Sequence, residues 1–154
     1  MGLRITVPPE GKVVINSAVI QNRSKSEQAD LYVLNHANVI RGKNIMQAEE
    51  ATTPVRRAYF LMQSIIMENA GMDDPRLATF DEFLIDLLGA FEQPEVVQRL
   101  QESRRLAADG AVYKAMMALK PVMKYEDAVL ALGQAIEVEA GAAEAFRELA
   151  VQEG

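Results

Sequence analysis

The sequence contains no cysteine, no tryptophan and a single histidine among its 154 residues. The absence of cysteine excludes disulfide bonds, thiolate metal sites and cysteine nucleophiles, and it suits a reducing cytoplasm. The one histidine, His36, stands in a polar stretch without a neighbouring carboxylate, which is typical of a surface residue. Phosphate-loop, GxSxG, HExxH and EF-hand motifs are absent too. The sequence therefore predicts a protein that is not an enzyme and uses no metal or cofactor.

Long apolar runs are also missing. The longest apolar stretches are a few residues each, far below the roughly 20 residues that a bilayer-spanning helix needs. Residues 1–9 show no charged segment followed by an apolar one, so no signal peptide is predicted. Hydrophobic residues make up 49% of the chain and charged residues 25%, which is typical of a globular protein. We expect a cytoplasmic protein with no membrane partner.

Charge is distributed unevenly along the chain. Residues 1–60 hold 8 basic and 5 acidic side chains, a net charge of +3, whereas residues 61–154 hold 8 basic and 17 acidic ones, a net charge of −9. An anionic partner such as RNA would be attracted to the first part and repelled by the second. The simpler interpretation is that solvated surface charges are scattered unevenly.

The first 47 residues carry the pattern of short strands. Leu3, Ile5 and Val7 alternate with polar residues, as in a half-buried strand. Asn16-Ser17 separates two apolar runs and predicts a tight hairpin, because asparagine tolerates a positive φ. A second hairpin is predicted around residues 35–38, after an exposed polar loop at 22–30. The predicted strands, five or six in number, are 3–7, 12–15, 18–21, 31–34, 39–40 and 45–46.

From residue 48 the apolar period changes to that of helices. Helix starts are predicted at Pro54, Pro75 and Pro94, because proline is favoured at the first helical position. Each of these prolines follows a polar residue, and Thr53 is a typical N-cap. A fourth helix is predicted over 111–132, kinked or broken at Pro121, and an Ala- and Glu-rich helix over 134–152.

These elements predict an α+β fold, with a small antiparallel β-rich N-terminal unit, either a sheet or a partly open barrel, before a helical C-terminal unit. We predict a β-rich unit at 1–47, a helical unit at 48–132 and a helical C-terminal extension at 133–154, together forming one compact two-lobed domain.

Two arginines occupy an unusual position. Arg56 and Arg57 fall in the first turn of the helix that begins at Pro54, where the helix dipole disfavours cations and free backbone N–H groups favour an anion. A phosphate held by these N–H groups and the guanidinium groups would explain them. The alternative is an internal ion pair with Glu49 or Glu50, just upstream.

A second candidate is the set of cations in the predicted sheet, together with one aromatic residue. Cations on a sheet neutralise phosphates and an aromatic ring stacks on bases, a common combination in proteins that bind single-stranded RNA. The residues predicted to bind RNA are Lys12, Arg23, Lys25, Tyr32, Arg41, Lys43, Arg56 and Arg57.

Several segments occur in a distinctive order along the chain. They are VVINSAVIQN at 13–22, VIRGKNIM at 39–46, EEATTPVRRAYF at 49–60, and downstream Asp109-Gly110, Tyr113-Lys114-Ala115 and Tyr125-Glu126-Asp127. In this order they resemble the FlbT family, the flagellum biosynthesis repressors of α-proteobacteria.

The resemblance implies a post-transcriptional regulator that associates with the 5′ untranslated region of flagellin mRNA and lowers its translation or lifetime. It also implies a link with FlaF, a small flagellar protein of opposite effect. Two hypotheses follow. Either the basic N-terminal unit binds RNA directly, or the helical unit binds FlaF or flagellin and acts on the mRNA indirectly. The sequence leaves the oligomeric state open.

Overall fold

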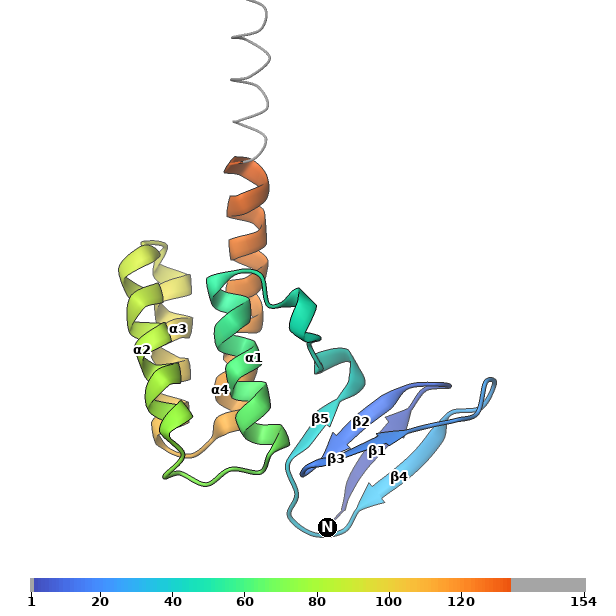
Figure 1. Cartoon of the computed structure of the whole chain (residues 1–154). Helices are drawn as coiled ribbons and strands as arrows, with labels where there is room; N and C mark the ends of the chain where they lie inside the picture. Colours follow the sequence, from blue (N-terminus) through green and yellow to red (C-terminus); the bar gives the residue numbers. More distant parts are fainter. Residues whose placement is uncertain (1, 134–154) are drawn as a thin grey trace, which may run out of the picture.

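The computed structural model describes residues 2–133, in which five short strands precede a set of helices (Figure 1). This order confirms the predicted α+β class. The predicted helix over 134–152 lies outside the described residues. The elements are β1 (Leu3–Val7), β2 (Lys12–Ile15), β3 (Ala18–Gln21), β4 (Ala29–Val33), β5 (Val39–Arg41), the one-turn 3-10 helices η1 (Gly42–Asn44) and η2 (Ala48–Glu50), then α1 (Pro54–Met67), α2 (Pro75–Ala90), α3 (Pro94–Ala108) and α4 (Val112–Ala118).

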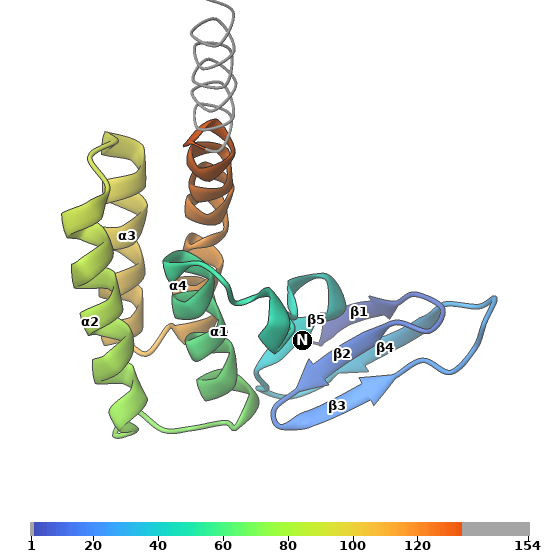
Figure 2. The same cartoon turned by 45° about the horizontal axis from the view of Figure 1, so that its top comes forward.

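The strands form two open antiparallel sheets rather than a closed barrel. One sheet pairs β1 with β4, and the other has the order β3-β2-β5. Ile5 and Val7 from β1 and Val13 from β2 form a small core that joins the two sheets. The β-rich unit lies beside the helices, as Figure 2 shows.

The predicted hairpin around residues 35–38 is wrong. β4 pairs with β1, where Leu31 lies opposite Ile5, and β5 pairs with β2, where Ile40 lies opposite Val14. Each late strand thereby places apolar side chains on a buried face, which a local hairpin between them would not provide. Two further corrections follow: β4 begins at residue 29, inside the predicted loop, and residues 45–46 form no strand.

Strand β2 is buried on both faces, each in a different core. Val13 packs in the small core between the sheets, whereas Val14 packs with Ile40 in the main core that the helices share. Both valines are almost fully buried. This double burial explains why the strand lacks the alternation of apolar and polar residues that a sheet with one wet face shows.

The hairpin between β2 and β3 confirms the turn predicted at Asn16-Ser17. Asn16 has a φ of 52°, in the left-handed region that asparagine tolerates. Its side-chain Oδ1 accepts a hydrogen bond from the backbone N–H of Asn38 at 3.0 Å, which joins this turn to the segment before β5.

Local capping signals fix the helix starts where the sequence predicts them. The side chains of Thr53, Asp74 and Gln93 accept hydrogen bonds from backbone N–H groups in the first turns of α1, α2 and α3, and each helix has proline at its start. The predicted break in the fourth helix is confirmed: α4 ends at Ala118, and residues 120–133 are helical again. Pro121 is the second residue of that stretch, where its missing N–H costs no helical hydrogen bond.

Two side chains of α1 fasten the segment that follows β5. The Gln63 amide bonds to both backbone groups of Met46: its Oε1 accepts from the N–H at 2.7 Å, and its Nε2 donates to the carbonyl at 2.8 Å. One turn earlier, the Tyr59 hydroxyl donates to the backbone carbonyl of Asn44. Both side chains are buried, so residues 44–46 are held on the helix where water does not compete.

Within residues 2–133, no helix is both long enough and apolar enough to span a membrane.

Candidate nucleic-acid interface

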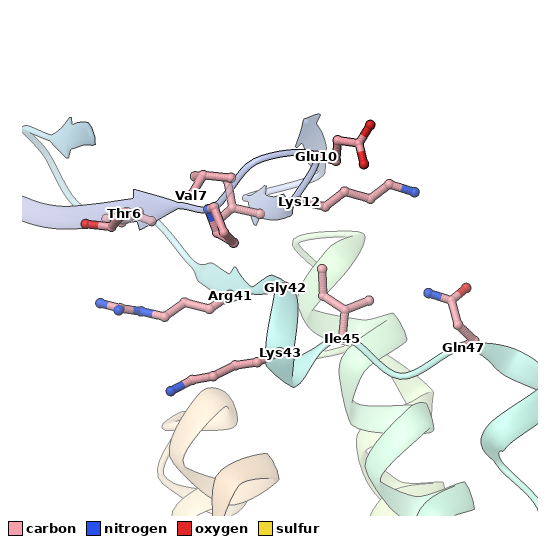
Figure 3. A pocket seen from close by; sticks show the side chains of 13 residues that line it. Thr6, Val7, Glu10, Lys12, Arg41, Gly42, Lys43, Ile45 and Gln47 are labelled. Carbon is pink, nitrogen blue, oxygen red and sulfur yellow. The ribbon is translucent and has the colours of Figure 1, made fainter. Parts of the chain in front are cut away.

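A groove of about 510 Å³ runs between the edge of β1, the turn at residues 8–11 and the segment 41–47. Three of the predicted RNA-binding residues, Lys12, Arg41 and Lys43, line it. Glu10 is the one carboxylate among its lining residues. In Figure 3, Arg41 and Lys43 extend toward the same side, whereas Lys12 extends toward the other. Glu10 lies on the same side as Lys12, so the excess of positive charge is at the side of Arg41 and Lys43 (Figure 3).

The three cations of the groove have no carboxylate partners within residues 2–133. Among the described residues, neither Lys12, Arg41 nor Lys43 forms an ion pair. Arg41 makes one long contact, from Nη2 to the backbone carbonyl of Arg4 at 3.5 Å. Exposed cations without partners raise the local concentration of anions around them. The groove is therefore suited to a negatively charged ligand.

Gly42, between the two cations of the segment, has to be glycine for a steric reason. A Cβ atom at this position would lie 2.5 Å from the backbone carbonyl oxygen of Lys12. The absence of a side chain lets the chain after β5 pass close to β2 and holds Arg41 and Lys43 over the groove.

Replacing Gly42 by alanine is expected to destabilise the protein by about 1–3 kcal/mol, because overpacking against backbone forces a shift of the segment. Urea unfolding followed by circular dichroism measures this change. Gly89→Ala is the matched control, since nothing lies within 4 Å of a Cβ atom there. Equal stability of the two variants would contradict the close approach at Gly42.

The structure places three other predicted residues outside the groove. Arg23 and Lys25 are exposed in the loop before β4. A 3.0 Å hydrogen bond from the Glu10 N–H to the carbonyl of Ser24 joins this loop to the neighbouring turn. Tyr32 is exposed on β4, opposite Arg4 of β1. Its ring is therefore available for stacking, but it is not among the residues that line the groove.

Arg4, which the sequence analysis did not single out, is already paired. Its guanidinium bonds to Asp30 across the β1–β4 sheet, with Nη2 2.8 Å from Oδ2. The hydrogen bonds from Arg4 hold the pKa of the Asp30 carboxyl below its ordinary value. The charge of Arg4 is therefore compensated by Asp30, whereas the cations that line the groove have no such partner among the described residues.

At the start of α1, the chain supplies its own carboxylates. Oε2 of Glu126, a residue only 5% exposed, accepts the Val55 N–H at 3.2 Å, and Asp127 pairs with Arg56 at 2.8 Å. The ion-pair partner of Arg56 is thus a residue 71 positions downstream, not Glu49 or Glu50. Arg57 is exposed and lines a different, mostly apolar groove of about 390 Å³.

Two lysines that the sequence analysis did not single out, Lys120 and Lys124, lie in a cleft that includes Lys43. Their spacing places them on one helix face, a signal that is visible in the sequence. Their approach to Lys43 depends on tertiary packing, and no local pattern reveals it.

Fold and groove together define a mixed α+β protein whose β-rich part presents a basic surface groove. The sequence matches the family model described as flagellar protein FlbT over residues 3–130. The chain therefore belongs to the FlbT family, as its segments indicated.

Curated relatives agree with this assignment. A protein of Caulobacter sp. (strain K31), named probable flagellum biosynthesis repressor protein FlbT, is 32% identical over 130 residues, covering 82% of this chain and 95% of the relative. The flagellum biosynthesis repressor protein FlbT of Caulobacter vibrioides is 31% identical over 130 residues, covering 82% and 88%. A Mesorhizobium japonicum relative is 30% identical over 124 residues, covering 80% and 82%. No solved structure matches the chain.

Proposed function

We propose that this protein is a cytoplasmic repressor of flagellum biosynthesis that binds the 5′ untranslated region of flagellin mRNA and lowers its translation or lifetime. The observation that carries the proposal is the groove that Lys12, Arg41 and Lys43 line, none of which forms an ion pair among the described residues. The names of the relatives support a regulatory role in flagellum biosynthesis. A message bound at its leader is less accessible to ribosomes.

The groove offers both kinds of contact that RNA recognition needs. Its cations meet phosphates, and the Arg41 guanidinium can donate two parallel hydrogen bonds to one of them. Thr6 and Gln47 also line the groove and carry groups that donate and accept hydrogen bonds, as base edges require. Phosphate contacts supply affinity and base contacts supply selectivity for the leader.

The test is binding of the purified full chain to a flagellin leader RNA, measured by fluorescence anisotropy at two salt concentrations. For Arg41→Gln we expect about tenfold weaker binding, because a hydrogen bond between charged groups contributes about 1.5–3 kcal/mol. The slope of log affinity against log salt should become shallower by about 0.7 for each phosphate that the variant no longer neutralises. Arg99→Gln, on an exposed part of α3, is the control and should bind like the wild type.

A folded wild-type protein that does not bind the leader would contradict direct RNA binding. The second candidate function is then a protein interaction of the helical part, with FlaF or flagellin as the ligand. One observation favours it: the apolar groove beside Arg57 is lined by Phe83, Leu87 and Phe91, and Phe83 is exposed. Copurification of tagged protein with each partner separates the two.

A further inference from the structure

Three segments far apart in the sequence meet in a cleft of about 250 Å³. The segment after β5 contributes Lys43, the first turn of α1 contributes Arg56, and the helical stretch 120–133 contributes Lys120 and Lys124. Each of these four side chains is a cation.

Positive charge exceeds negative charge in this cleft. Its two carboxylates are Glu50 and Asp127, and Asp127 is already bound to Arg56. Within residues 2–133, Lys43, Lys120 and Lys124 form no ion pair. Lys120 and Lys124 are four residues apart on a helix, so they repel each other weakly, and an anion bound between them would relieve that repulsion.

Lys120 is held in place by neutral groups. Its ammonium donates to Oδ1 of Asn44 at 2.5 Å, and Nδ2 of the same buried amide donates to the Tyr113 hydroxyl at 3.1 Å. These contacts fix the position of the ammonium and leave its charge uncompensated, because neither partner is an anion. A positioned cation loses little conformational entropy when a ligand binds.

Arg56 adds an unsatisfied donor to the same cleft. Its Nη2 is paired with Asp127, but its Nε is buried and has no hydrogen-bond partner among the described groups. Buried N–H groups of this kind are rare, because leaving one unpaired costs about 1–3 kcal/mol. Because this Nε is inaccessible to solvent, as is the unpartnered Oε1 of Glu126, the part of Arg56 that can face a ligand is the end of its guanidinium.

Lys43 belongs to both the cleft and the groove that holds Arg41. We propose that the cleft of Lys43, Lys120 and Lys124 is a second phosphate-binding subsite, which holds the backbone of an RNA strand continuing from the groove. The inference rests on the proposed function and extends the RNA-binding surface onto the helical part. It assigns a role to two lysines in the acidic part of the chain.

The experiment compares leader RNA binding by the full-length wild type, Lys124→Gln and Lys120→Gln/Lys124→Gln at two salt concentrations. We expect about threefold weaker binding for the single variant, about tenfold for the double variant, and a salt slope shallower by about 0.7 for each phosphate left without its cation. Lys124 is exposed, so its replacement is expected to leave the fold intact. Lys114→Gln, exposed on α4, is the matched control, and Lys124→Arg should retain binding.

Two outcomes would overturn the subsite. If the wild type and Arg41→Gln differ in RNA affinity while the two lysine variants bind like the wild type, the groove binds RNA and the cleft does not. If no RNA binds but inorganic tripolyphosphate binds and Lys124→Gln weakens it, the cleft takes a small phosphate compound, not RNA. The second outcome also removes the proposed function, and the first leaves it standing.

Discussion

Replacing Gln63 by leucine is expected to lower the free energy of unfolding by about 2–5 kcal/mol. The substitution keeps the volume of the side chain and removes both hydrogen bonds to the backbone of Met46. Because Gln63 is only 3% exposed and Met46 8%, water does not replace these bonds. Each orphaned backbone group costs about 1–3 kcal/mol. Urea unfolding monitored by circular dichroism measures the loss.

The matched control is Gln98→Leu on an exposed face of α3, where the same chemical change removes no buried hydrogen bond. We expect it to alter stability by less than about 0.5 kcal/mol. Similar losses for both variants would show that the amide of Gln63 does not fasten the segment. Because Arg41 and Lys43 shortly precede Met46, Gln63→Leu should also weaken RNA binding while the protein remains folded.

Tyr59→Ala is expected to destabilise the protein by about 3–5 kcal/mol, because it removes a large side chain from the main core. Tyr59 is 2% exposed, and its ring packs in the core beneath the segment that carries Asn44. Burial, with a smaller effect from Tyr113, raises the pKa of the Tyr59 hydroxyl. The hydroxyl therefore stays protonated and donates to the Asn44 carbonyl across the physiological pH range.

Tyr59→Phe separates packing from hydrogen bonding. It keeps the ring and leaves the Asn44 carbonyl without its donor, so the expected loss is about 1–3 kcal/mol. Thermal and urea denaturation of both variants provide the measurement. If Tyr59→Phe cost as much as Tyr59→Ala, the hydroxyl rather than the ring would dominate. If neither variant were destabilised, the position of Tyr59 in the core would be wrong.

Local chemistry made much of the fold predictable. The helix starts at Pro54, Pro75 and Pro94 and the turn at Asn16 each depend on residues within a few positions of each other. Strand pairing was not predictable in the same way. β4 and β5 follow one another in sequence, yet they join different strands, because burial in two separate cores decides the pairing. Such competition between distant partners leaves little trace in a local pattern.

In the candidate site, too, the local features were predictable from the sequence and the long-range contacts were not. The sequence identified Lys12, Arg41 and Lys43 from their charge, and the structure places all three in the lining of one groove. It did not identify the partner of Arg56, because Asp127 lies 71 residues away. A carboxylate close in sequence is no guide when a helix from the far end of the chain packs against the first turn of α1.

Because β2 is buried on both faces, apolar burial alone does not fix its register against the neighbouring strands. Adjacent valines occupy the two cores, so a slide by one residue that brings Val14 to the place of Val13 would bring Ile15 to the place of Val14 and bury a similar apolar area. A slide in the opposite direction would bring Lys12 into a core at the place of Val13. A slide in either direction would also move the left-handed backbone conformation from Asn16 to a neighbouring residue. The conformation of a single turn residue therefore helps to fix the register of β2, and with it the positions of the cations beside the groove.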